Sequence, residues 1–291
     1  FEEFVGDAGI TQEQAEVQLE TMAAAGVFDF FDISGGSYAT LHLGVASMTV
    51  EDGYMIPFGK RAKEIVGERA KVFIVGRIRE IEQAEQVIAD GAADMVGMTR
   101  AHMADPHIGA KVAARREREI RPCVGATYCL DRIYEGRDAL CIHNPATGRE
   151  STMPQNIEKT NGPAKRVVIV GAGPAGLEAA RVSAARGHNV VVFEAASKAG
   201  GQVHLAARSR RRRDLAGIYE WRVERCHALG VEFRFNAYAE ANDVMAEKPD
   251  TVIIATGGLP NTSFLEAGAE LAVTSWDILS GDAAPGSETL V

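Results

Sequence analysis

Short apolar runs alternate with amphipathic stretches along the first third of the chain. The apolar runs predict three strands, at 27–33, 72–75 and 94–96. The amphipathic stretches predict helices at 57–66 and 80–90. Thr11 and Gln14 have the spacing of a capping box, so we expect a further helix from there to Gly26. Strands and helices in such short alternation predict βα units with a parallel sheet.

The pattern changes after a polar stretch at 153–163, which we interpret as a linker. Before it, residues 111–121 predict a helix with a basic face. After it, the β-branched run at 166–170 predicts a buried parallel strand. A glycine-rich turn, an Ala-rich helix to Gly187 and a strand at 189–193 then complete a βαβ unit.

Composition narrows the class of protein. The 291 residues are 46% hydrophobic and 24% charged, which is typical of a globular protein. The formal charge of −9 argues against a nucleic-acid partner. No apolar run is long enough to cross a bilayer and no signal peptide is recognisable, so we expect a cytoplasmic protein without a membrane partner. The chain begins with Phe1, and 288–291 resemble the start of a strand, so we expect a piece of a longer protein.

The turn after the strand at 166–170 has the G-x-G-x-x-G pattern of a dinucleotide site. Gly171 permits a tight turn, Gly173 lets the backbone approach a pyrophosphate, and Gly176 lets helix and strand pack closely. An acid at the end of the second strand favours the unphosphorylated ribose of FAD or NAD. The predicted site comprises Gly171, Gly173, Pro174, Ala175, Gly176, Glu194, Gly201, Gln202, Ala255, Thr256 and Gly257. The alternative is a fold of the same kind without a ligand.

Two turns in the first third suggest a second site. Three strands do not close an eight-stranded barrel, so they form either a small open sheet or the tail of a larger barrel. Loops after the last two strands of such barrels commonly bind phosphate. The predicted cradle for the phosphate of FMN comprises Gly76, Arg77, Gly97, Thr99 and Arg100. The alternative is that these are ordinary turn glycines and surface arginines.

The motifs together resemble a known family of flavoproteins. VFIVGRI, ADMVGMTRAHMADP, CVGATYCLDRIYEGRDALCIHNPATGRE and VVIVGAGPAGLEAAR follow one another as in the Old Yellow Enzyme branch that contains trimethylamine dehydrogenase and 2,4-dienoyl-CoA reductase. The resemblance implies an α/β fold: the C-terminal part of a TIM (β/α)₈ FMN barrel followed by a Rossmann-like FAD- or ADP-binding domain. Residues 1–115 would be the last three βα units, 116–163 a cysteine-rich metal segment with a linker, and 164–291 an incomplete FAD- or NAD(P)-binding domain.

The cysteine segment departs from the pattern of these relatives. Members with a four-iron, four-sulfur cluster are implied to use four thiolates, whereas this chain has Ala126 at the second position. Cys123, Cys129 and Cys141 with His143 would supply a Cys₃His set for Zn²⁺. The alternatives are an iron–sulfur cluster with an unusual fourth ligand, or no metal. Cys226 falls in a later helical pattern and is expected in the core.

The sequence of the cysteine segment is most similar to that of the demethylases of N-methylated amino acids, the dimethylglycine and N-methylproline group. Such enzymes are implied to pass a hydride from an N-methyl carbon to the flavin and to release formaldehyde. The alternatives are an NADPH-dependent dienoyl-CoA or enoate reductase and an FAD-binding electron-transfer subunit. An electron-acceptor protein, a partner subunit or a second copy of the chain are possible partners.

An aromatic residue and an arginine-rich run are two further features of the sequence. Tyr38 follows the first predicted strand and is the candidate to line an amine pocket, because aromatic rings hold cations. The sequence identifies no catalytic acid or base. The arginine-rich run at 208–213 we interpret as a solvated loop.

Overall fold

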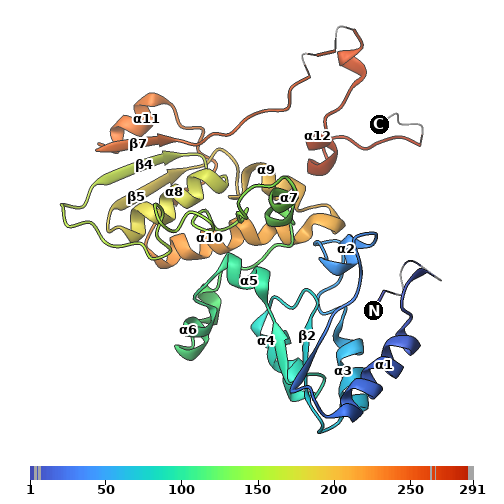
Figure 1. Cartoon of the computed structure of the whole chain (residues 1–291). Helices are drawn as coiled ribbons and strands as arrows, with labels where there is room; N and C mark the ends of the chain where they lie inside the picture. The colour runs from blue at the N-terminus through green and yellow to red at the C-terminus, as the bar shows by residue number, and fades with distance from the viewer. Residues whose placement is uncertain (3–4, 6–7, 263, 266, 288–291) are drawn as a thin grey trace. The chain divides into compact units, whose positions relative to one another are not determined.

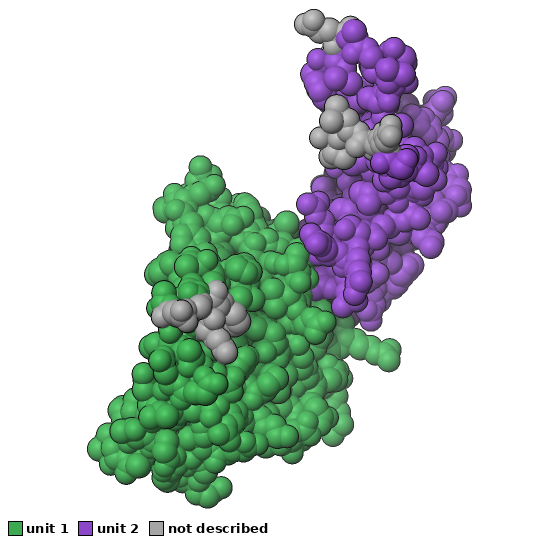
Figure 2. Space-filling view, turned by 90° about the vertical axis from the view of Figure 1, so that its right-hand side faces the viewer, with its two compact units in different colours: residues 1–153 green, residues 154–291 purple. Residues whose placement is uncertain are grey.

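The computed structural model describes residues 1, 2, 5, 8–262, 264, 265 and 267–287, so the strand expected to begin at 288 lies outside the described residues. The chain divides into two compact units, Phe1–Met153 and Pro154–Val291, shown in green and purple in Figure 2. Both units are α/β with a parallel sheet, as the sequence predicts.

The first unit is built on a three-stranded parallel sheet in the order β1-β2-β3. Its strands are β1 (Phe30–Ile33), β2 (Lys71–Val75) and β3 (Met95–Gly97). The predicted strand at 27–33 is therefore shorter than expected, and it starts three residues later. Val72 and Ile74 on the central strand are fully buried and point to the same face of the sheet, where each belongs to its own hydrophobic cluster.

Helices follow each strand of this unit and cover the sheet (Figure 1). They are α1 (Gln12–Ala25), α2 (Leu41–Gly44), α3 (Ile56–Val66), α4 (Ile81–Ala89), α5 (Thr99–Ala104), α6 (Ile108–Ala113), η2 (Glu117–Glu119) and α7 (Tyr128–Tyr134). The capping box predicted at the start of α1 is confirmed, with the Thr11 side chain and Gln14 bonding each other's backbone, and Gly26 ends the helix in the left-handed conformation.

The single basic helix expected at 111–121 is wrong. Helix α6 ends at Ala113, and Arg115 takes a positive φ of 55°, which an α-helix does not allow. The buried carboxylate of Asp105 fixes the chain beyond that point, because it accepts from the Arg121 amide at 2.8 Å and forms an ion pair with Lys111. Tertiary hydrogen bonds therefore override the helical pattern of the sequence here.

The second unit has a four-stranded parallel sheet in the order β6-β5-β4-β7. Its strands are β4 (Arg166–Val170), β5 (Asn189–Phe193), β6 (Glu232–Arg234) and β7 (Thr251–Ile254). The predicted strands at 166–170 and 189–193 are confirmed residue for residue. The chain thus begins at the centre of the sheet, builds outward to β6, and crosses back to add β7 on the other side of β4.

Helices pack on both faces of this sheet (Figure 1). They are α8 (Pro174–Ala185), α9 (Gly201–Ala206), η3 (Arg210–Leu215), α10 (Ala216–Ala228), α11 (Ala241–Ala246), η4 (Ala269–Leu271) and α12 (Ser275–Ser280). Cys226 of α10 is fully buried in the core, as expected. Arg222 of α10 is also buried and pairs with Glu178 of α8 at 2.8 Å, which ties the two helices together. No helix within the described ranges combines the length and apolar character needed to cross a membrane.

Candidate functional site

The glycine turn of the second unit is closed to side chains at its two ends. Gly171 has a φ of 103°, and a Cβ there would lie 2.4 Å from the carbonyl oxygen of Ala255. A Cβ on Gly176 would lie only 1.9 Å from the carbonyl oxygen of Gly171. Both glycines are required because the backbone of the turn after β7 lies directly against Gly171, and the backbone of Gly171 lies directly against Gly176.

Gly173, the middle glycine of the turn, has open space where its side chain would be. A Cβ placed there meets no heavy atom within 4 Å. Gly173 is the N-cap of α8, a helix of 12 residues with Pro174 in its first turn. The N–H groups that open a helix have no acceptor within it, and the helix dipole is positive at this end. The space beside Gly173 is therefore suited to a phosphate group.

The carboxylate of Glu194 is held by the backbone around the turn. One oxygen accepts from the Ala172 amide at 2.7 Å and the other from the Ala196 amide at 2.8 Å. Glu194 thus positions the glycine turn, a role that the sequence did not reveal. Each carboxylate oxygen has a second lone pair and can accept one more hydrogen bond. Binding of the ribose hydroxyls by Glu194 is therefore compatible with these contacts and stays a prediction.

Two other turns meet the glycine turn at the same edge of the sheet. The Gly200 amide donates to the Ala172 carbonyl at 2.9 Å, and a Cβ on Gly201 would lie 3.2 Å from the Cα of Gly173. The Gln202 side chain donates to the Gly258 carbonyl at 3.0 Å, so α9 and the turn after β7 are joined. The structure therefore brings together the three predicted segments, 171–176, 201–202 and 255–257.

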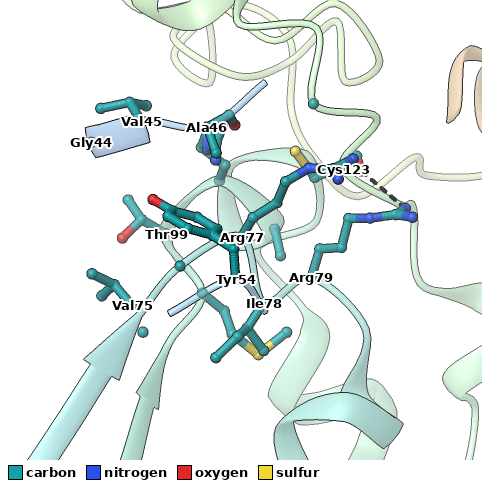
Figure 3. A pocket seen from close by; sticks show the side chains of 16 residues that line it. Gly44, Val45, Ala46, Tyr54, Val75, Arg77, Ile78, Arg79, Thr99 and Cys123 are labelled. Carbon is teal, nitrogen blue, oxygen red and sulfur yellow. Dashed lines mark hydrogen bonds between the residues drawn. The ribbon is translucent and has the colours of Figure 1, made fainter. Parts of the chain in front are cut away.

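A cavity of about 290 Å³ lies at the carboxyl ends of β2 and β3 in the first unit (Figure 3). All five residues of the predicted phosphate cradle line it, although they come from two turns about 20 residues apart. The residues that line it are Gly44, Val45, Ala46, Tyr54, Val75, Gly76, Arg77, Ile78, Arg79, Gly97, Met98, Thr99, Arg100, Ala101, Cys123 and Gly125.

The guanidinium groups around this cavity form hydrogen bonds and ion pairs with residues in or beside its wall. Arg100 donates to the Ala46 carbonyl at 2.6 Å, and Arg77 bonds the Val50 carbonyl and pairs with Asp52 at 3.1 Å. Arg79 pairs with the same carboxylate at 2.9 Å. Arg79 also pairs with Glu80 at 3.0 Å, so the three arginines face two carboxylates. One positive charge remains in excess, which favours an anionic ligand. The arginines therefore stabilise the cavity wall through hydrogen bonds as well as supplying positive charge, and no pattern in the sequence indicates this second role.

Several wall residues of this cavity have no signal in the sequence. Gly44, Val45 and Ala46 lie at the end of α2, and Cys123 and Gly125 belong to the cysteine segment. Arg79 reaches the Cys123 carbonyl at 3.4 Å, a contact visible in Figure 3. Tyr38 does not line this cavity within the described residues and is 85% exposed, so its role at an amine pocket stays a prediction.

The three cysteines of the segment and His143 line one small cavity of about 30 Å³, together with Ala126 and Arg100. Burial raises the pKa of the Cys123 thiol, and the Arg100 guanidinium opposes that rise. Burial also raises the pKa of the Cys129 thiol, with the neighbouring Cys123 adding to it. These thiols therefore hold their protons at neutral pH, and a metal ion would have to displace those protons.

The predicted fourth ligand, His143, is fully buried, with its Nδ1 2.9 Å from the Pro122 carbonyl. Its backbone amide donates to the Cys141 sulfur at 3.4 Å. Over the described part of the chain, no three or more His, Cys, Asp or Glu side chains form a group that could hold a metal ion. The four predicted ligands therefore line one cavity without forming a ready-made Cys₃His centre in the described residues, and Ala126 offers no thiolate for a four-cysteine cluster.

Comparison with known proteins agrees with this α/β architecture. The family model for pyridine nucleotide-disulphide oxidoreductases matches residues 136–284, half of the chain, and the chain belongs to this family. A solved structure of 2-naphthoyl-CoA reductase with 2-naphthoyl-CoA superposes with a TM-score of 0.86 and 28% identity over 95% of this chain and 42% of that one.

Two curated relatives show which members of the family the chain is similar to in sequence. The chain is 59% identical over 219 residues to a probable N-methylproline demethylase of Rhizobium meliloti, which covers 75% of this chain and 32% of that protein. It is 45% identical over 281 residues to a multifunctional alkene reductase/demethylase of Caballeronia cordobensis, which covers 95% of this chain and 40% of that protein. The expected family resemblance is thus confirmed, and the chain spans well under half the length of these relatives.

Proposed function

We propose that the chain is part of a flavin-dependent oxidoreductase that oxidatively demethylates an N-methylated amino acid of the N-methylproline or dimethylglycine type. The observation that carries the proposal is the electropositive cavity at the ends of β2 and β3, lined by Arg77 and Arg100 and paired in the same chain with the open glycine turn of α8. The named likeness to a demethylase supports the substrate class.

The proposed architecture assigns residues 1–115 to the last three βα units of a TIM barrel and 164–291 to a Rossmann-type domain. The parallel order β1-β2-β3 and the order β6-β5-β4-β7 support it. The segment 116–163 joins the two. Its cysteines either bind zinc or an atypical iron–sulfur cluster or remain free thiols, which elemental analysis with a visible spectrum distinguishes.

In this proposal FMN would be held in the first cavity, and FAD or its ADP moiety at the glycine turn. Bound FMN supplies a hydride acceptor for oxidation of the substrate carbon next to nitrogen. The backbone at Gly76 and Thr99 and the positive arginines would hold the phosphate and so orient the flavin. Tyr38 would hold the cationic amine through its ring. Electrons would leave through an acceptor protein or partner subunit.

The test is a substrate screen with the full-length protein. Without an electron acceptor and without oxygen, N-methylproline and dimethylglycine should each bleach the flavin absorbance. With an artificial electron acceptor, which reoxidises the flavin, each should release formaldehyde in equal amount to the amine product. Proline and glycine, which lack the N-methyl group, are the matched controls and should do neither. Flavin reduction only by NADPH, followed by reoxidation with an enoyl thioester, would refute demethylation.

That outcome would favour the second candidate, an NADPH-dependent alkene or enoate reductase. It is supported by the relative named for both activities and by the structural likeness to a reductase. An FAD-binding subunit without substrate chemistry of its own would show neither reaction and would carry no FMN.

A further inference from the structure

Five arginines form a compact basic segment in the second unit, Arg208 with Arg210–Arg213. The sequence suggested a solvated loop, which is wrong in part: residues 210–215 form η3, a 3₁₀ helix between α9 and α10. The Arg212 amide donates to the Ser209 carbonyl at 2.8 Å, so the backbone of the segment is hydrogen-bonded. All five arginine side chains are nonetheless exposed, and that of Arg213 is 82% exposed.

The charge of this segment is little compensated by its surroundings. Arg208 donates to the Ser280 carbonyl at 2.7 Å, and Arg213 approaches the Asp214 carboxylate only to 3.8 Å. Among the described residues, the three arginines 210–212 form no ion pair.

Some exposed arginines elsewhere in the chain are paired with a carboxylate. Arg61 pairs with Glu16 at 2.8 Å, and Arg69 pairs with Glu20 at 2.6 Å. Arg116 likewise contacts a carboxylate at 2.5 Å. Arg118 and Arg186 are also exposed and form no ion pair among the described residues. What distinguishes the basic segment is therefore the concentration of five exposed arginines within residues 208–213.

The geometry of η3 favours carboxylates as the partner groups. A 3₁₀ helix has three residues per turn, so Arg210 and Arg213 project from the same side. Each guanidinium presents a planar set of donors that binds a carboxylate with two parallel hydrogen bonds. We propose that the basic segment is a docking surface for a partner protein that presents a cluster of Asp and Glu side chains.

The dimensions and charge of the chain argue for a protein rather than nucleic acid. Six residues of 3₁₀ helix rise about 12 Å in total, which reaches only a few phosphates of a duplex. The rest of the chain is strongly acidic, with a net charge of −9 that includes these arginines. A long polyanion would be repelled outside the segment, whereas a small acidic patch would contact only the segment.

The experiment measures binding of the whole chain to an immobilised oligoglutamate peptide at rising salt. The test variant is the triple change Arg210→Gln, Arg211→Gln and Arg212→Gln, which keeps side-chain length and removes three charges. The matched control removes the same charge from exposed scattered positions, Lys60→Gln, Arg118→Gln and Arg137→Gln. Circular dichroism verifies that both variants are folded. A duplex DNA and a phosphatidylserine vesicle serve as alternative probes.

We expect the unchanged chain to bind the peptide with an affinity that falls steeply with salt. The triple change in the segment should weaken binding by about tenfold or more, while the control loses less than about threefold. Equal losses in the two variants would overturn the proposal, because binding would then follow net charge alone. Tighter binding of the segment to DNA or to the vesicle than to the peptide would overturn it as well.

Discussion

The last and the middle glycines of the dinucleotide turn, Gly176 and Gly173, should respond differently to the same substitution. In Gly176→Ala, the new methyl group would lie 1.9 Å from the Gly171 carbonyl oxygen, far inside the 3.4 Å where ordinary contact begins. In Gly173→Ala it would meet nothing within 4 Å, and the φ of −73° suits alanine. The first change should therefore damage the fold, and the second only the ligand site.

The expected magnitudes follow from these contacts. Overpacking against backbone costs about 3 kcal/mol, and the better helix propensity of alanine returns up to about 1 kcal/mol, so Gly176→Ala should destabilise the second unit by about 2 kcal/mol. At about 4 °C per kcal/mol for a unit of this size, its Tm falls by about 8 °C. Gly173→Ala should cost under about 1 kcal/mol at the N-cap. Its methyl group, however, occupies the space proposed for phosphate and should weaken ADP binding about tenfold or more.

The assay is a pair of measurements on each purified variant: a thermal melt without ligand, and calorimetric titration with ADP. Gly187→Ala, at a positive φ of 93° with no contact for its Cβ, is the control for backbone strain alone. Unchanged ADP affinity in Gly173→Ala would refute the assignment of the open space to phosphate. An unchanged Tm in Gly176→Ala would refute the close approach of the Gly171 carbonyl oxygen to Gly176.

Three further outcomes are expected. Burial raises the pKa of Cys226 to about 12, so the folded state keeps a proton that the unfolded chain loses near pH 9; the free energy of unfolding should therefore fall as pH rises from about 9 to 12, and denaturant titrations of Cys226→Ala should lack that slope. Arg222→Ala should lower the free energy of unfolding by up to about 3 kcal/mol, because it removes the buried guanidinium that pairs with Glu178 and leaves that carboxylate to Arg181. A loss below about 1 kcal/mol in urea titrations would contradict this. Arg100→Ala removes the bond to the Ala46 carbonyl and a positive charge from the cavity, so FMN content after gel filtration should fall about tenfold, and full retention would contradict the proposed phosphate site.

Much of the fold was predictable because its signals are local. The strands at 166–170 and 189–193 are continuous β-branched runs, and the capping box of α1 depends only on Thr11 and Gln14. The prediction of one helix at 111–121 was wrong because the buried Asp105 carboxylate, which lies outside that stretch of sequence, bonds the Arg121 amide and fixes the chain after Ala113. Tertiary hydrogen bonds of this kind leave no trace in hydrophobic periodicity.

The candidate sites divide in the same way. Glycine turns at strand ends are visible in the sequence because only glycine fits there, which is why residues 171–176 could be assigned together. What surrounds them was not visible: the bonds of Glu194 to the turn, and the wall at Ala46 and Cys123 that closes the other cavity. These contacts link segments more than 20 residues apart, and no local pattern encodes them.

The cysteine segment is part of the wall of the proposed flavin cavity, since Cys123 and Gly125 line it and the Gly125 carbonyl accepts from the Met48 amide at 2.8 Å. Cutting the gene after the last βα unit would therefore remove one side of that cavity. Any transplant of the segment into a related enzyme would need to carry the loop at 44–52 with it. The smallest segment of this protein that can be exchanged as a unit therefore extends to the cysteine segment that completes the cavity wall, and not only to the end of the last helix of the βα units.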